Sequence, residues 1–205
     1  MKKSIMLIAA MCMTSVMTFA QKVIRVSTDK TDLVMKVSPK GRLYQVYLGD
    51  KFLNPADYDN LKWDVYAASD GAVCQRGHEV YATSGAEDFF EPAVAVTHAD
   101  GNMTTYLYYK SSVQKAVEGG TETVITLQDK VYPFTVKLHY VAYAKENVIK
   151  GWSEISHKEK SPITLWRYSS TMLYFKSNKY FLTNYHSDWA KEGQPETTQL
   201  STGKK

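Results

Sequence analysis

Apolar and polar side chains alternate along most of this chain, and this period of two constrains the fold more than any other feature. The clearest case is the segment 132–144, in which Lys137 and His139 stand between apolar residues. One face of that segment carries Phe134, Val136, Leu138, Tyr140 and Ala142. Successive side chains of a strand point to opposite faces of its sheet, so the segment predicts a half-buried antiparallel strand. His139 is predicted to lie on the solvated face.

The same alternation recurs in segments separated by short polar turns. Strands are predicted at 22–27, 32–38, 42–49, 103–110, 121–129, 147–156 and 163–170. Turns are predicted at 28–31, 99–102, 118–120, 145–147 and 157–162. No segment has a long helical period, and we expect strand-dominated structure from about Val23 to Tyr185. Many strands at this spacing predict an all-β fold, a large antiparallel β-sandwich.

One long stretch, residues 54–92, lacks the alternation. It is too long for an ordinary connection, so we predict that it is functional or folded on itself. Within it, Asp57, Asp59 and Asp64 are spaced somewhat like the ligands of a calcium loop. Lys62 stands where such a loop needs glycine, so no calcium site is predicted.

The first 20 residues have the pattern of a secretory signal peptide. Two lysines precede the apolar stretch 5–17, and small residues lead up to Ala20, which predicts cleavage before Gln21. The stretch is too short to span a membrane. A lipoprotein anchor at Cys12 is disfavoured, because a methionine precedes it where a small residue is expected. The sequence therefore predicts an exported protein, periplasmic or secreted, without a membrane segment after cleavage.

The remaining residues, 21–205, are predicted to form one domain. Loss of the two N-terminal lysines lowers the formal charge from +4 to +2, which argues against a nucleic-acid or anionic-membrane partner. Only Cys74 remains after cleavage, so no internal disulfide is expected, and we interpret it as a small buried residue. Aromatic residues make up 13% of the chain. In an exported protein this favours sugar binding, although most tyrosines are ordinary strand residues.

Residue patterns with known chemistry are missing from the sequence. It has no phosphate-binding glycine loop and no serine in a nucleophile elbow. The histidines stand at 78, 98, 139, 157 and 186, and none pairs with a second ligand at metal spacing. Nothing marks a pair of catalytic carboxylates. The residues alone thus predict an exported all-β domain related to carbohydrate, with no metal and no cofactor.

Three segments carry a resemblance to a known family: 81–96, 148–175 and 188–195. The first resembles a family pattern of Tyr, then Gly, then Asp-Phe-Arg, one variable residue and Pro-Ala. The second follows a strand–turn–strand that leads into a serine-containing run. The third resembles a Trp-Ala-Arg-Glu segment. The matching residues are Tyr81, Gly85, Asp88, Phe89, Pro92, Ala93, Trp189, Ala190 and Glu192. In this order and spacing they resemble the N-terminal β-supersandwich domain of glycoside hydrolase family 36, the α-galactosidases.

This resemblance implies substrate contacts in one loop. Asp88 and Phe89 match a family loop that can reach the sugar pocket, sometimes that of a neighbouring subunit. The chain departs from the family at Phe90 and Lys191, where members usually carry arginine. Phenylalanine lacks the hydrogen-bond donors of arginine, so a sugar contact here would use Asp88 and stacking. The alternative is that Asp88 caps a turn and that Phe89 and Phe90 pack into the sandwich.

The resemblance also implies the reaction of the parent protein. The family hydrolyses terminal α-galactosides with retention, using one aspartate as nucleophile and a second as acid and base. Both lie on the β/α barrel that follows the N-terminal domain, so no catalytic residue is expected in this chain. The chain is expected to be an N-terminal portion that ends inside its domain. The partner would be an α-galactoside oligosaccharide, and the parent enzyme would be a homo-oligomer.

Two other classes of function remain open at this stage. One is a free-standing carbohydrate-binding or adhesin-like β-sandwich, and the other is a scaffold whose surface serves assembly. The reading frame after Lys205 separates them from the enzyme. A continuation into a barrel with two catalytic aspartates would favour the enzyme, and a stop codon would favour binding or assembly.

Overall fold

The computed structural model describes residues 22–62, 78–85, 91–175 and 179–200. The strands are β1 (Val23–Ser27), β2 (Thr31–Val37), β3 (Leu43–Asp50), β4 (Val94–Thr97), β5 (Tyr108–Val117), β6 (Gly120–Gln128), β7 (Phe134–Tyr143), β8 (Val148–His157), β9 (Thr164–Tyr168), β10 (Phe181–Tyr185) and β11 (Pro195–Gln199). One short helix, α1 (Asp57–Asn60), follows β3. No helix in the described part of the chain is long and apolar enough to cross a membrane.

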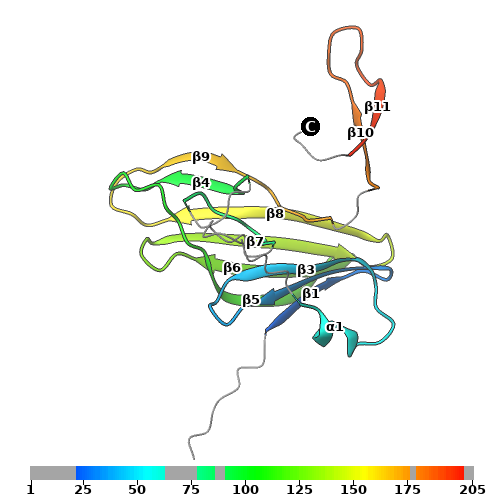
Figure 1. Ribbon diagram of the computed structural model, residues 1–205, viewed down its shortest axis with the longest axis horizontal. Helices are drawn as coiled ribbons and strands as arrows, with labels where there is room; N and C mark the ends of the chain where they lie inside the picture. The colour runs from blue at the N-terminus through cyan, green and yellow to red at the C-terminus, as the bar shows by residue number, and fades with distance from the viewer. Residues whose placement is uncertain (1–21, 63–77, 86–90, 176–178, 201–205) are drawn as a thin grey trace, which may run out of the picture.

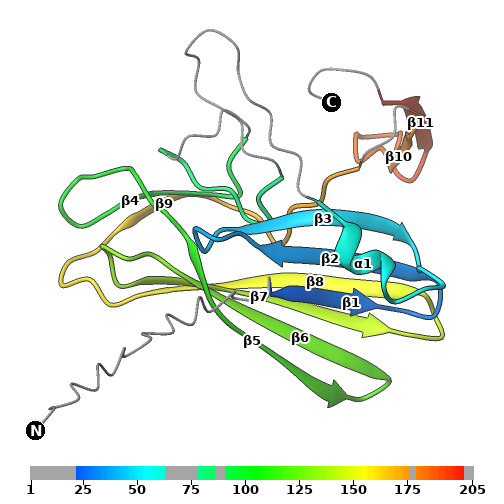
Figure 2. The ribbon, with the colours of Figure 1, turned by 60° about the horizontal axis from the view of Figure 1, so that its bottom comes forward.

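Two antiparallel sheets form the body of the domain. A three-stranded sheet has the order β1-β2-β3, and a four-stranded sheet has the order β5-β6-β7-β8. Figure 2 shows the first sheet stacked over the second. The pair β4-β9 and the hairpin β10-β11 complete the described strands. The predicted all-β sandwich is confirmed.

The core lies between the two sheets and is built from alternate residues of their strands. Along β7 every second side chain, from Phe134 to Ala142, is buried. These residues pack against the inward side chains of the smaller sheet, including Ile24, Val26 and Met35. The period of two therefore predicted the buried face correctly, because burying one face of a strand requires that spacing.

The predicted turns fall between the observed strands. The β5–β6 hairpin turns at residues 118–119 and the β7–β8 hairpin at 144–147. Gly119 and Asn147 take positive φ angles of 70° and 55° there, a conformation that glycine and asparagine adopt most readily. Consecutive antiparallel hairpins consequently bring residues 117–120 and 143–148 to the same end of the sheet.

One predicted strand, 103–110, is wrong in its first half, since β5 begins only at Tyr108. Side chains, rather than a neighbouring strand, take up several of the backbone N–H groups before it. The Asn102 carboxamide oxygen accepts from Thr104 N at 2.9 Å, and the Asp129 carboxylate accepts from Tyr106 N at 2.6 Å. A backbone N–H engaged by a side chain is not available to a ladder, which explains the late start.

The described first part of the long irregular region, which was predicted to be functional or folded on itself, packs on the three-stranded sheet. Tyr58 of α1 packs on Val34 and Val46, on the side of the three-stranded sheet away from the main core. The Lys36 side chain is buried there, and Nζ donates to the carbonyls of Asp59 and Leu61 at 3.1 and 2.6 Å. Burial lowers the pKa of Lys36, against the opposing effect of Asp59.

Candidate functional site

The two residues predicted to contact substrate, Asp88 and Phe89, lie outside the described residues, as does Cys74. Backbone hydrogen bonds join the chain on the two sides of that loop. Ser84 N donates to the carbonyl of Val94 at 3.0 Å, and Ala93 N donates to that of Ala82 at 2.8 Å. The loop therefore leaves the core and returns to it at neighbouring positions.

Gly85, which matches the family pattern, occupies a position that excludes a side chain. Its φ of 75° is unfavourable for other residues, and an added Cβ would lie 2.8 Å from the Cα of Thr104. Tyr81, from the same segment, is buried, and its hydroxyl donates to the carbonyl of Ser169 at 2.7 Å. The two residues hold the base of the loop, and their roles are structural.

The third family-like segment lies in a hairpin, β10–β11, that was not predicted from the alternation of side chains. Trp189, Ala190 and Glu192 belong to the connection between β10 and β11. Figure 1 shows this hairpin standing away from the two sheets. Trp189 is 91% exposed. The sequence does contain a hairpin pattern here, because Gly193 stands between two segments, 181–185 and 195–199, that are rich in β-branched and aromatic residues.

Large apolar side chains are exposed along the C-terminal part of the chain. We call these residues the apolar band: Leu165, Trp166, Tyr168, Leu173, Phe175, Tyr180, Phe181, Leu182, Tyr185, Trp189 and Leu200. Scattered exposed apolar residues are normal, but a concentration of this kind marks an interaction surface. The apolar band therefore leaves apolar surface open to water on β9 and on the projecting hairpin.

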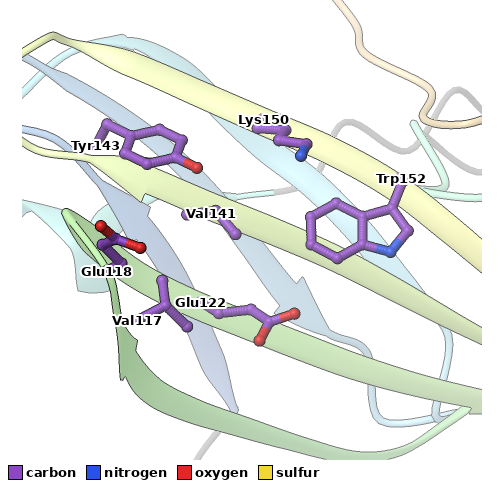
Figure 3. A pocket seen from close by; sticks show the side chains of 7 residues that line it. All are labelled: Val117, Glu118, Glu122, Val141, Tyr143, Lys150 and Trp152. Atoms are coloured by element: carbon purple, nitrogen blue, oxygen red, sulfur yellow. The ribbon is translucent and has the colours of Figure 1, made fainter.

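A second feature is a hollow on the outer face of the four-stranded sheet, which we call the outer hollow. Its volume is about 610 Å³. Figure 3 shows Val141 between two groups of side chains, with Trp152 at one side. Glu118 and Glu122 come from the β5–β6 hairpin, and Tyr143, Lys150 and Trp152 come from β7 and β8; Val117 completes the lining.

A line of charged and aromatic groups crosses the sheet beside this hollow. The Glu122 carboxylate contacts Lys115 Nζ and His139 Nδ1, each at 2.8 Å. The His139 ring stacks on Trp152 with centroids 4.7 Å apart. Its Nε2 lies 3.6 Å from the Glu154 carboxylate, beyond hydrogen-bond distance.

The prediction that His139 is solvated is wrong, because its side chain is only 12% exposed. It does share the outer face with Lys137, as predicted. Trp152 and Glu122 on the two neighbouring strands cover its ring from either side. A period of two identifies the face of a sheet but not what the adjacent strands place over it.

The other buried histidine also has a structural environment. His98 Nδ1 lies 2.8 Å from the Glu159 carboxylate, and Nε2 lies 2.9 Å from the Thr105 hydroxyl. Its ring stacks on Tyr132 at 3.6 Å. Both ring nitrogens are used and the ring is buried, so His98 has no open position for substrate. No group of metal-binding side chains occurs among the described residues.

The contacts of the Glu122 carboxylate with Lys115 and His139 predict how the stability of the domain changes at acidic pH. Hydrogen bonds from Lys115 and then from His139 lower the pKa of Glu122 below 4.5. A lowered folded-state pKa adds stability above the unfolded-state value, and that stability is lost as pH falls through the folded-state value. We expect the urea midpoint to fall on acidification below about pH 4.5 and to fall less steeply in Glu122→Gln.

Glu118→Gln is the matched control for that experiment. Glu118 lines the same hollow but forms no ion pair within the described residues. Its substitution is expected to leave the acid dependence of the midpoint unchanged. An identical slope in wild type and Glu122→Gln would show that the Lys115–Glu122–His139 contacts add no stability.

A family model for the glycosyl hydrolase family 36 N-terminal domain matches residues 41–205. The chain belongs to this family. The match covers most of the chain, including both hairpins of the four-stranded sheet and the C-terminal hairpin. No curated protein matches the chain.

Solved structures share the fold at low sequence identity. The α-galactosidase from Lactobacillus brevis has a TM-score of 0.75 and 21% identity, over 88% of this chain and 28% of its own. The family 36 α-galactosidase AgaA from Geobacillus stearothermophilus, in a complex with raffinose, has a TM-score of 0.74 and 23% identity over 89% and 28%. The galactosidase domain of the α-galactosidase–sucrose kinase AgaSK has a TM-score of 0.76 and 21% identity over 89% and 28%. The family 36 domain spans little more than a quarter of these relatives.

Proposed function

We propose that this chain is the N-terminal, non-catalytic portion of an exported α-galactosidase that hydrolyses terminal α-galactosides with retention. The family-model match over residues 41–205 carries the proposal. Solved structures with this fold are α-galactosidases, and the matched part covers 28% of the length of those enzymes. Residues 1–20 act as the export signal, and residues 21–205 form the domain.

The chemistry of the described residues supports a non-catalytic role. Retaining glycosidases need two carboxyl groups about 5 Å apart beside the scissile bond. Glu122 beside the outer hollow and Glu159 near His98 are instead held by basic partners or a backbone N–H group. We place the nucleophile and the acid/base of the parent enzyme on another domain, as the family resemblance implies.

The apolar band supports a role in a larger protein. Aromatic side chains such as Trp166 and Tyr168 are exposed on β9, and Phe181 and Tyr185 are exposed on the projecting hairpin. Covering them with a barrel domain or a neighbouring subunit would remove this surface from water. The parent enzyme forms a homo-oligomer through such a surface. Its substrates are α-galactoside oligosaccharides.

The reading frame that follows Lys205 tests this proposal. We expect it to encode a β/α barrel with two catalytic aspartates, and we expect the complete product to cleave an aryl α-galactoside with release of the α-anomer, observed by NMR. The 205-residue chain alone should show no turnover. Peptide sequencing of the exported product should begin at Gln21.

Two results would overturn the proposal. A stop codon directly after Lys205 would favour a binding or assembly module. Turnover by the purified 205-residue chain, retained after further purification, would place the catalytic groups within it. If mass spectrometry finds the protein in the cytoplasmic fraction with an uncleaved N-terminus, only the export part of the proposal is contradicted.

A further inference from the structure

The outer hollow presents polar groups that have no hydrogen-bond or ion-pair partner within the described part of the chain. The Glu118 carboxylate and the Tyr143 hydroxyl form no hydrogen bond or ion pair with the described residues. Among these residues, the Lys150 ammonium interacts only with the indole ring of Trp152, and its Nζ lies 5.3 Å from the centre of that ring. Figure 3 shows them placed around Val141 on two sides of the hollow. A hydrogen-bond acceptor (Glu118), a donor (Lys150) and a hydroxyl that can do either (Tyr143) thus surround the apolar side chain of Val141.

Trp152 forms a prepared wall of this hollow. Its indole is half-buried and stacks on His139 with an angle of 12° between the rings. His139 is held in turn by Glu122 at 2.8 Å, and Glu122 by Lys115 at 2.8 Å. These contacts from three neighbouring strands restrict the ring before any ligand arrives. A site held in advance in this way loses little conformational entropy on binding.

The residues around the hollow select a neutral ligand with hydroxyl groups. The lining residues Glu118, Glu122 and Lys150 carry charges that sum to −1. Lys115, which contacts Glu122 from outside the lining, brings the sum to zero, so the hollow has no net attraction for a strongly charged ligand. Val117, Val141 and the indole offer apolar surface to C–H groups. A pyranose ring combines a C–H face with hydroxyls that both donate and accept, and 610 Å³ lies within the range of small-molecule sites.

We propose that the outer hollow is a non-catalytic binding site for a neutral pyranose ring of an oligosaccharide. The indole of Trp152 takes the C–H face of the ring. Lys150 donates to a hydroxyl, Glu118 accepts from one, and the Tyr143 hydroxyl does either.

An NMR titration of the isotope-labelled full chain with melibiose and with maltose tests the site. We expect saturable shifts of the Trp152 indole N–H and of the Glu118 and Tyr143 amides, with weak affinity. Trp152→Ala should weaken binding about tenfold or more, because the stacking surface is lost. Glu118→Gln should weaken it less, because the amide still accepts a hydrogen bond. Trp166→Ala, on β9, is the matched control and should bind as wild type.

Each outcome decides the proposal. Loss of binding in Trp152→Ala, with an unchanged melting temperature and wild-type binding by Trp166→Ala, supports it. Absence of saturable shifts with both sugars, shifts confined to residues outside the hollow, or equal affinity of wild type and Trp152→Ala would overturn it. Should Trp152→Ala fail to fold, Glu118→Gln and Lys150→Met decide, and wild-type affinity in both overturns the site. These results do not depend on whether the parent protein cleaves α-galactosides.

Discussion

The Phe134→Ala variant is expected to lose about 3–5 kcal/mol of unfolding free energy, the range for large aromatic side chains in cores. Phe134 is fully buried between the two sheets, and its ring meets the edge of His98 with centroids 5.8 Å apart. Truncation removes the apolar contacts and leaves a cavity that paired strands on both sides cannot close. Small domains have only about 5–15 kcal/mol of stability, so this loss is a large share of the total.

Urea unfolding followed by circular dichroism measures this effect through the midpoint. Val131→Ala is the matched control, since Val131 stands three residues before Phe134 and is 81% exposed. It should change stability by no more than about 0.5 kcal/mol. Equal midpoints for the two variants would mean that Phe134 is not in the core of the folded domain.

The second large effect is expected for Asp88→Asn in the complete parent enzyme. The resemblance places Asp88 in a loop beside the sugar pocket, and the structure shows that the loop leaves and re-enters the core at Ser84 and Ala93. A carboxylate that accepts a hydrogen bond from a galactose hydroxyl contributes about 1.5–3 kcal/mol, so kcat/KM should fall about ten- to a hundredfold. The melting temperature should stay unchanged.

The alternative reading assigns Asp88 to a turn, and the same variant distinguishes the two. A lowered melting temperature with unchanged kcat/KM would give the residue a structural role and remove the substrate contact. Asp100→Asn provides the comparison, because Asp100 holds a turn by accepting from Asn102 N at 3.0 Å and from the Tyr132 hydroxyl at 2.8 Å. It should lower stability and leave catalysis intact.

The period of two predicted several elements closely, for a physical reason. Strands β6 and β7 each bury one face against the other sheet, and the edge strand β8 packs Ile149 and Ile155 partly against the same core, so their sequences alternate. The prediction failed where that condition is not met. The hairpin β10–β11 buries little within the described part of the chain, and β11 was therefore missed. The segment before Tyr108 has strand-like residues, but side chains of Asn102 and Asp129 engage its backbone.

The sequence by itself determined the all-β class, the buried face of β7, the turns at Gly119 and Asn147, and the family. These depend on local chemistry and on motifs read in order along the chain. Only the tertiary structure decided that His139 is covered, that the C-terminal part exposes an apolar band, and that Glu118, Tyr143 and Trp152 border one hollow. Such features arise from strand pairing and sheet stacking, which join residues far apart in sequence, and no local pattern records those neighbours.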